Sequence, residues 1–332
     1  MKFLAILVVL GLEQWHSANW RGGVERLYVG YLRWLETGMI RWGTWPATAV
    51  ALLPVLLVIM IDVLAAPLWL LMLVWSMVVL YLLMGFRRFS HAVTEITESL
   101  RNGDLPMARK TLYDWQGGDS LTLGSDDIAL RTIEAGALAA YRCVFGVVFW
   151  FMVFGPSGAV FYWMLTLIAR EWSESLAGED ITMLTTARAE LGRVARWLLF
   201  IVDWLPVRLL AFSFAVVGDF EDAMYQWRAL PNDDAAFDGA TNENVLLATA
   251  FGALGLTWVR RVPPAPAKNA TEPATAFAKT ATKAAESEKT LGPPPESVPV
   301  TPDVLPSAIG LVWRALLFWL GLVLLLTVAY WS

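Results

Sequence analysis

The stretch TWPATAVALLPVLLVIMIDVLAAPLWLLMLVWSMVVLYLLMGF, residues 44–86, decides the fold class of this chain. Two apolar runs lie on either side of Asp62 and Pro67, and this pattern predicts a membrane-inserted helical hairpin with the Asp62–Pro67 region at its tip. Arginines flank the hairpin on both sides, so the positive-inside rule places both flanks in the cytoplasm and the tip outside. The flanking arginines are Arg21, Arg26, Arg33, Arg41, Arg87 and Arg88.

The composition indicates an all-α, polytopic membrane protein, with membrane lipid as its first expected partner. Of the 332 residues, 57% are hydrophobic and 17% are charged, whereas soluble domains are about half apolar and a quarter charged. The net charge of −5 gives no basis for nucleic-acid binding. Cys143 is the single cysteine and there are two histidines, so we expect no disulfide, no metal site and no resident cofactor.

Apolar and polar segments alternate along the chain and define its expected organisation. The segment before the last apolar run is rich in Pro, Ala, Thr, Lys and Glu, a composition that predicts a disordered linker. We expect an N-terminal apolar helix and amphipathic segment over 1–43, the transmembrane hairpin over 44–86, a cytoplasmic helical segment over 87–141, a membrane core with interrupted or re-entrant helices over 142–261, the linker over 262–307 and a C-terminal transmembrane helix over 308–332.

The apolar segment from Arg142 to Ala169 is interrupted by GPSG at residues 155–158. Each half holds about a dozen residues, which is too short to cross the bilayer. The segment is therefore either one kinked span or a re-entrant pair. A single span would carry Arg170 and the arginines after it to the outside, against the charge rule, so we favour the re-entrant pair. Whether residues 197–217 and 245–258 cross the bilayer stays open.

The run DWLPVRL, residues 203–209, places two opposite charges around a proline in apolar surroundings. A proline inside a helix removes a backbone hydrogen bond, and a charge at membrane depth usually faces a partner or a cavity. In one interpretation, Asp203 and Arg208 pair with each other or snorkel at a structural kink. In the other, Arg208 binds an anionic ligand in a cytoplasm-facing pocket, with Asp203 beside it.

Four further residues are candidates for ligand binding, and each has a plain structural alternative. Arg142 opens the interrupted segment, where an arginine can equally serve as an interface anchor. Glu134 precedes it by two helical turns on the same face, although carboxylates on helix faces are usually solvated. Asp119 follows two glycines in an expected turn, and Tyr162 can equally be a core or interface aromatic.

Several segments together resemble the CobD/CbiB membrane family. The run SLRNGDLPMAR at 99–109 resembles the family's LRxGDLxxAR, and FW at 149–150 with GPSGA at 155–159 resembles its PLFW…GGPPGAxxY. Residues 203–209 resemble its NxxPARL, and GALG at 252–255 resembles its late GALG. The segments keep the family's order, and the resemblance implies a membrane fold for the chain up to Trp258.

The resemblance implies one of two functions. The adenosylcobinamide-phosphate synthase branch amidates adenosylcobyric acid with an aminopropanol unit during cobalamin synthesis, using ATP and magnesium. The AmpE branch is an inner-membrane protein associated with β-lactamase induction and cell-wall signalling. Residues 142–150 resemble the AmpE run RFYLAPLFW, and residues 202–209 resemble its LDWVPVRL.

The chain departs from the synthase pattern where polar chemistry is expected. The stretch similar to the synthase-like ESxAENxxDG keeps Glu134, but its Glu-Asn pair becomes Leu138 and Ala139, and its acid becomes Arg142. The later NTxD becomes TLIA at 166–169. Magnesium-dependent ligation needs several acids and amides to hold the metal and the phosphates.

We therefore expect an AmpE-like signalling or accessory protein that binds an anionic small molecule and a protein partner of a cell-wall pathway, without synthase chemistry. The alternative is the synthase or a related ligase, for which ATP and magnesium would be needed. A third hypothesis is a scaffold that binds a protein through residues 89–140 and the linker.

Overall fold

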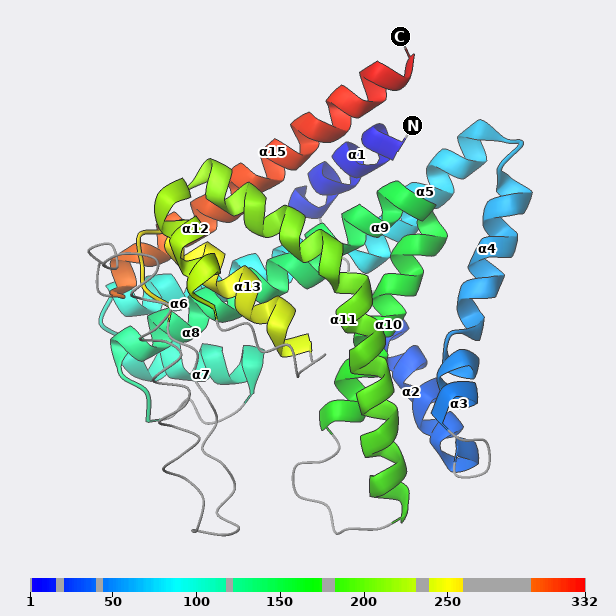
Figure 1. Cartoon of the computed structure of the whole chain (residues 1–332), viewed down its shortest axis with the longest axis horizontal. Coiled ribbons are helices and arrows are strands. Elements are labelled where there is room, and N and C mark those ends of the chain that lie inside the picture. Colours follow the sequence, from blue (N-terminus) through cyan, green and yellow to red (C-terminus); the bar gives the residue numbers. More distant parts are fainter. Residues whose placement is uncertain are drawn as a thin grey trace. The chain divides into compact units, whose positions relative to one another are not determined.

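The computed structural model describes residues 2–15, 21–39, 44–117, 122–174, 183–230, 239–258 and 300–331. Every regular element over these ranges is a helix (Figure 1). Within them, three helices are long and apolar enough to cross a membrane, Ser125–Phe154, Arg188–Val217 and Pro302–Ala329, and a bent pair of helices at Trp45–Ala65 adds a fourth if it counts as one span. The chain is thus an all-α, polytopic membrane protein, as its composition predicted.

The chain divides into two compact units. Unit 1 comprises Met1–His91, Ala139–Val207 and Trp319–Ser332, and unit 2 comprises Ala92–Leu138 and Arg208–Phe318. The elements are α1 (Lys2–Trp15), α2 (Arg21–Met39), α3 (Thr44–Ala51), α4 (Leu53–Ala65), α5 (Trp69–Leu83), α6 (Phe86–Arg101), α7 (Leu105–Gln116), α8 (Ser125–Ala140), η1 (Tyr141–Phe145), α9 (Gly146–Phe154), α10 (Pro156–Glu174), α11 (Met183–Val217), α12 (Phe220–Ala229), α13 (Gly239–Gly252), η2 (Pro302–Val304) and α15 (Leu305–Trp331).

The predicted hairpin is present in unit 1, with a bend inside its first arm. The helices α3 and α4 meet at an angle of 41°. The helix α5 turns back from the end of α4 (Figure 1) and packs against α1 and α10. Pro54 explains the bend, because it has no N–H to donate to the carbonyl of Val50 one turn earlier. Two tyrosines of α2 replace the missing donors. The hydroxyl of Tyr31 donates to the Val50 carbonyl at 2.8 Å, and that of Tyr28 donates to the Ala51 carbonyl at 3.0 Å.

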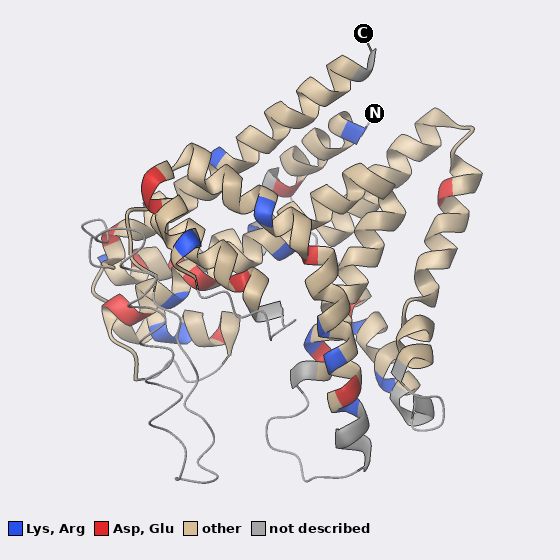
Figure 2. Ribbon diagram, in the orientation of Figure 1, with Lys and Arg blue, Asp and Glu red and all other residues tan. Residues whose placement is uncertain are grey.

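Asp62 is the one charged residue of α4 and α5 (Figure 2). Its Oδ1 accepts a hydrogen bond from the Trp75 indole at 2.8 Å, and its Oδ2 accepts one from the backbone N–H of Ser157 at 3.0 Å. A carboxylate away from water requires such donors. The side chain of Asp62 therefore links α4 to α5 and also to the start of α10.

The predicted break at Gly155 is present, but the helix before it is longer than expected. Gly155 has a φ of +76°, a backbone conformation that favours glycine, and Pro156 suits the first position of α10. The alanine-rich end of α8 continues through η1 into α9, which gives one helix of 30 residues, Ser125–Phe154. The half before the break is thus long enough to cross a membrane, which corrects the expectation that it is too short. The predicted boundary between residues 141 and 142 lies inside this helix.

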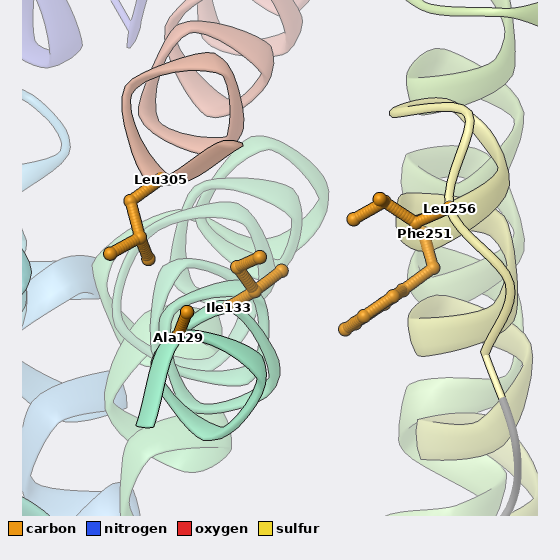
Figure 3. Packing of buried hydrophobic residues seen from close by; sticks show 5 residues of the cluster. All are labelled: Ala129, Ile133, Phe251, Leu256 and Leu305. Atoms are coloured by element: carbon orange, nitrogen blue, oxygen red, sulfur yellow. The ribbon is translucent and has the colours of Figure 1, made fainter. Parts of the chain in front are cut away.

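Unit 2 has its apolar core between α8 and the segments at the end of α13 and the start of α15. Figure 3 shows Phe251 and Leu256 pointing toward Ala129 and Ile133 of α8, with Leu305 in the same cluster. A second cluster joins α6, α7 and α8. Its buried members are Ile96, Ala108, Leu112 and Ile128.

The turn between α6 and α7 is formed by Gly103 and Asp104. Gly103 has a φ of +73°, and the side chain of Asp104 accepts a hydrogen bond from the backbone N–H of Met107 at 3.1 Å. Asp104 is therefore the N-cap of α7, because its carboxylate satisfies one of the free N–H groups of the first turn.

The helix α11 passes through Pro206 without interruption and is 35 residues long. The proline therefore does not split this segment, and residues 197–217 belong to a candidate span. The other open segment, 245–258, holds the end of α13, a helix of 14 residues. The predicted linker over 262–307 lies mostly outside the described residues, and α15 begins at Leu305 rather than at Ala308.

Candidate functional site

A buried tyrosine–carboxylate cluster joins η1, α10 and α11 in unit 1. The hydroxyl of Tyr141 donates to Oδ1 of Asp203 at 2.5 Å, and the two residues are 2% and 8% exposed. The rings of Tyr141 and Tyr162 meet edge to face, with their centroids 6.4 Å apart. A hydrogen bond to an ionised carboxylate is stronger than one between neutral groups. Tyr141 thereby stabilises the carboxylate of Asp203, which lies in an otherwise apolar part of α11.

Tyr162 has an unsatisfied polar atom at the centre of this cluster. The residue is fully buried, and its hydroxyl has no hydrogen-bond partner of normal geometry among the described residues. Tyr141, Asp203 and Arg142 all lie within electrostatic reach of this hydroxyl. A buried hydroxyl without a partner costs about 1–3 kcal/mol. The hydroxyl can therefore take part in a further hydrogen bond.

The local backbone explains why Tyr162 approaches so closely. The residues of η1 form a turn of π-helix, in which the N–H of Gly146 bonds to the carbonyl of Tyr141. Turns of this kind are rare and occur frequently at functional sites. A Cβ atom at Gly146 would lie 2.5 Å from the end of the Tyr162 ring. Only glycine leaves room for that ring.

The structure brings three of the candidate residues from the sequence, Asp203, Tyr162 and Arg142, to this part of unit 1. Arg142 is the second residue of the π turn and is exposed. Sequence reasoning missed Tyr141, which contacts two of the candidates. Its position next to Arg142 was visible, but nothing in the sequence distinguished it from the other aromatics of the membrane segments.

Arg208 belongs to unit 2, where its Nη1 donates to Oδ1 of Asn242 at 3.1 Å. Asn242 is 2% exposed and lies on α13. Residues five apart point about 140° away from each other around a helix, and Asp203 and Arg208 each have a hydrogen-bond partner on another helix. Asp203 is thus bonded to η1, and Arg208 to α13. Sequence reasoning also missed Asn242, which lies in a strongly polar segment without a recognisable motif.

Glu134 accepts a hydrogen bond from a tryptophan of the GALG region. The indole Nε1 of Trp258 donates to Oε1 of Glu134 at 3.2 Å. The backbone N–H of Trp258 donates to Oε1 of Gln226 at 2.9 Å, and Nε2 of Gln226 donates to the carbonyl of Leu256. The half-buried Glu134 is therefore held by a residue that follows it by 124 positions.

Asp119, the remaining candidate, lies outside the described residues. Within the part of the chain that the structure describes, no three His, Cys, Asp or Glu side chains converge as a metal site would require. We therefore assign no metal ligand and derive no step through magnesium.

The comparisons with known proteins agree with the resemblance seen in the sequence. A family profile described as CobD/Cbib protein matches residues 6–280. The chain is similar to "Cobalamin biosynthesis protein CobD" of Stutzerimonas stutzeri, at 26% identity over 182 residues, which cover 54% of this chain and 55% of the relative. It is also similar to the protein of the same name from Chromobacterium violaceum, at 26% identity over 178 residues, or 54% and 53% of the two chains.

The chain thus spans about half the length of the curated relatives that it matches. Both relatives carry the name of the cobalamin branch, not that of AmpE. No solved structure matches the chain.

Proposed function

Because the chain belongs to the CobD/CbiB family, we propose that it acts in cobalamin biosynthesis and joins a corrinoid carboxyl group to an aminopropanol unit as an amide. The single observation that carries this proposal is the family match over residues 6–280, read together with the printed names of the two relatives. This gives the synthase alternative more support than the AmpE-like expectation has.

The proposed reaction forms one C–N bond. ATP supplies a phosphoryl group that turns a carboxylate oxygen into a leaving group. The ammonium group of the amine loses one proton to solvent, its nitrogen bonds to the acyl carbon and loses a second proton as the amide forms, and ADP and phosphate are released. The protein's part is to bind and orient anionic and cationic groups. In this proposal Arg208 binds a phosphate or carboxylate oxygen, with Asn242 fixing its guanidinium. A planar guanidinium suits such an anion because it donates in pairs.

Unit 1 offers hydrogen-bonding groups of its own, at Tyr162, Arg142 and Asp203. The hydroxyl of Tyr162 can donate or accept a hydrogen bond, and the exposed Arg142 can donate. The hydrogen bond from Tyr141 keeps Asp203 as an acceptor beside them.

An AmpE-like accessory function is the second candidate, because several positions that are polar in the synthase pattern are apolar here. Ala169 is 6% exposed, and Leu138 and Ala139 replace the Glu-Asn pair. In this case the same binding groups would detect an anionic ligand without turning it over, and a cell-wall signalling protein would be the partner.

Complementation separates the two candidates. The gene is expressed in a strain that lacks its cobinamide-phosphate synthase, on medium where growth requires cobalamin synthesis. We expect growth with the wild-type gene and loss of growth with Arg208→Gln at an equal level of protein in the membrane. Absence of growth with the wild-type protein present in the membrane contradicts the synthase proposal. Restored β-lactamase induction in a strain lacking AmpE would then support the second candidate.

A further inference from the structure

A chain of hydrogen bonds in unit 2 runs from α12 to the carboxylate of Glu134 on α8. Gln226 binds the segment after α13 at two points, since it accepts from the N–H of Trp258 and donates to the carbonyl of Leu256. The indole of Trp258 then donates to one oxygen of Glu134 at 3.2 Å. Because the backbone is bonded to Gln226 at Leu256 and at Trp258, the indole of Trp258 has little freedom to move away from the carboxylate.

Two glycines bring Trp258 into this position. A Cβ atom at Gly252 would lie 2.6 Å from the Cα of Ala223, so glycine allows α13 to touch α12. The N–H of Asp219 bonds to the carbonyl of Ala253 at 3.0 Å at the same contact. Gly255 has a φ of +69° and turns the chain back toward Gln226. The GALG run therefore directs Trp258 toward α8.

Glu134 uses one of its two carboxylate oxygens in a hydrogen bond within the described residues. It is half-buried and lies between the buried residues Ile133 and Ala135. Within the described ranges, Trp258 is its one hydrogen-bond donor, through Oε1. A carboxylate in such surroundings is stabilised by donors or by a positive charge. Because an indole can donate but cannot accept a proton, Trp258 fixes Oε1 and leaves Oε2 available as an acceptor.

We propose that Trp258, held by Gln226, is a positioning residue that presents the free oxygen of Glu134 to the protonated amine of the ligand. This inference rests on the proposed function, in which that amine belongs to the aminopropanol unit. A bond between an ammonium group and a carboxylate is charge-assisted and strongly directional. Fixing one carboxylate oxygen sets the direction of the other, so the indole acts on the amine through Glu134 without touching it.

The test measures amine binding and turnover with full-length protein in lipid nanodiscs. The probe is aminopropanol, titrated with and without adenosylcobyric acid and ATP. We expect Trp258→Phe to raise the KM for the amine about tenfold, the effect of one hydrogen bond to a charged group, while kcat changes less than twofold. Gln226→Leu should have a similar effect, because it releases the backbone of Trp258. Glu134→Gln should abolish the charge-assisted contact and weaken the binding of the amine further.

Two comparisons separate positioning from general damage. Trp150→Phe makes the same chemical change, but its indole N–H is buried without a partner among the described residues, so the KM for the amine should not change. In the double variant, Glu134→Gln with Trp258→Phe should bind the amine no worse than Glu134→Gln alone. Residues that act through one contact are coupled in this way, whereas independent residues add.

The possible outcomes distinguish the positioning role of Trp258 from the proposed function of the protein. Additive effects in the double variant, or equal effects of Trp258→Phe and Trp150→Phe, overturn the positioning role even if the wild-type protein is active. A wild-type protein that binds aminopropanol but forms no amide overturns the proposed function, and the same variants, measured by binding alone, still test the positioning role. A wild-type protein that binds no aminopropanol overturns this inference.

Discussion

Oδ2 of Asp62 accepts a hydrogen bond at 3.0 Å from the backbone N–H of Ser157, 95 positions further along the chain. Ser157 is the second residue of α10, where helix N–H groups have no partner within the helix. A carboxylate at this end also interacts favourably with the helix dipole. The one charged residue of the hairpin thus serves as a cap for a distant helix, which explains how a charge is tolerated there.

Asp62→Ala should lower the stability of the protein more than the loss of either single hydrogen bond. It removes the acceptor for two donors, the Trp75 indole and the Ser157 N–H, and stranded donors cost about 1–3 kcal/mol each. The measurement is thermal unfolding in nanodiscs. Trp75→Phe, which leaves the Ser157 bond in place, should have the smaller effect. An unchanged melting temperature for Asp62→Ala would show that the cap contributes nothing.

Tyr31→Phe should destabilise the bend between α3 and α4 by about 1 kcal/mol, because the Val50 carbonyl then loses its donor. The control is the same substitution in a Pro54→Ala background. There the new N–H at position 54 can bond to Val50, so removing the tyrosine hydroxyl should cost less. Equal costs in the two backgrounds, measured by denaturant unfolding, would refute the link between the proline and the tyrosine.

Gly146→Ala should destabilise unit 1 and disturb ligand binding, because the added methyl group overlaps the end of the Tyr162 ring. Overpacking of this kind costs about 1–3 kcal/mol. Gly30→Ala in α2 is the matched control, since a Cβ atom there meets nothing within 4 Å and alanine is the better helix former. If both variants melt at the same temperature as the wild type, the close approach has no energetic consequence.

Asp203→Asn and Arg208→Gln should act independently. Asp203 is bonded to Tyr141 and Arg208 to Asn242, so the double variant should show the sum of the two effects on membrane level and stability. Tyr141→Phe should instead be coupled to Asp203→Asn, by about 1–3 kcal/mol for a bond to a buried charge. Arg208→Lys should fold and lose binding, because an ammonium group cannot reproduce the planar fork.

Mutual rescue would give the opposite pattern. If the double variant of Asp203 and Arg208 recovered both stability and function, the two charges would be a structural pair, as the first interpretation of the sequence held.

Much of the membrane architecture was predictable because a long apolar run can form few structures other than a membrane helix. Residues 44–86, the glycine–proline break after Phe154 and the N-cap at Asp104 all follow from local chemistry that the sequence states directly. The length of Ser125–Phe154 was underestimated. Polar residues near Ser125 suggested a separate cytoplasmic helix, although the alanines that follow favour one continuous helix.

The contacts of the site were much less predictable than its residue types. Asp203, Tyr162 and Arg142 were recognised as unusual polar residues in an apolar core, but their connection through Tyr141 depends on a π turn that no sequence pattern announces. The partnership of Glu134 and Trp258 joins positions 124 apart. Such contacts arise from tertiary packing, which spacing along one helix does not encode.

Amide formation by the purified protein follows directly from its proposed place in cobalamin biosynthesis. Full-length protein in nanodiscs is incubated with adenosylcobyric acid, aminopropanol, ATP and magnesium. The molecular mass of the corrinoid product is then measured by mass spectrometry. The account predicts a product equal in mass to the acid plus the amine less one water, with ADP released in equal amount, and loss of this product in Arg208→Gln and Glu134→Gln. A folded wild-type protein that forms no amide and releases no ADP under these conditions would contradict it.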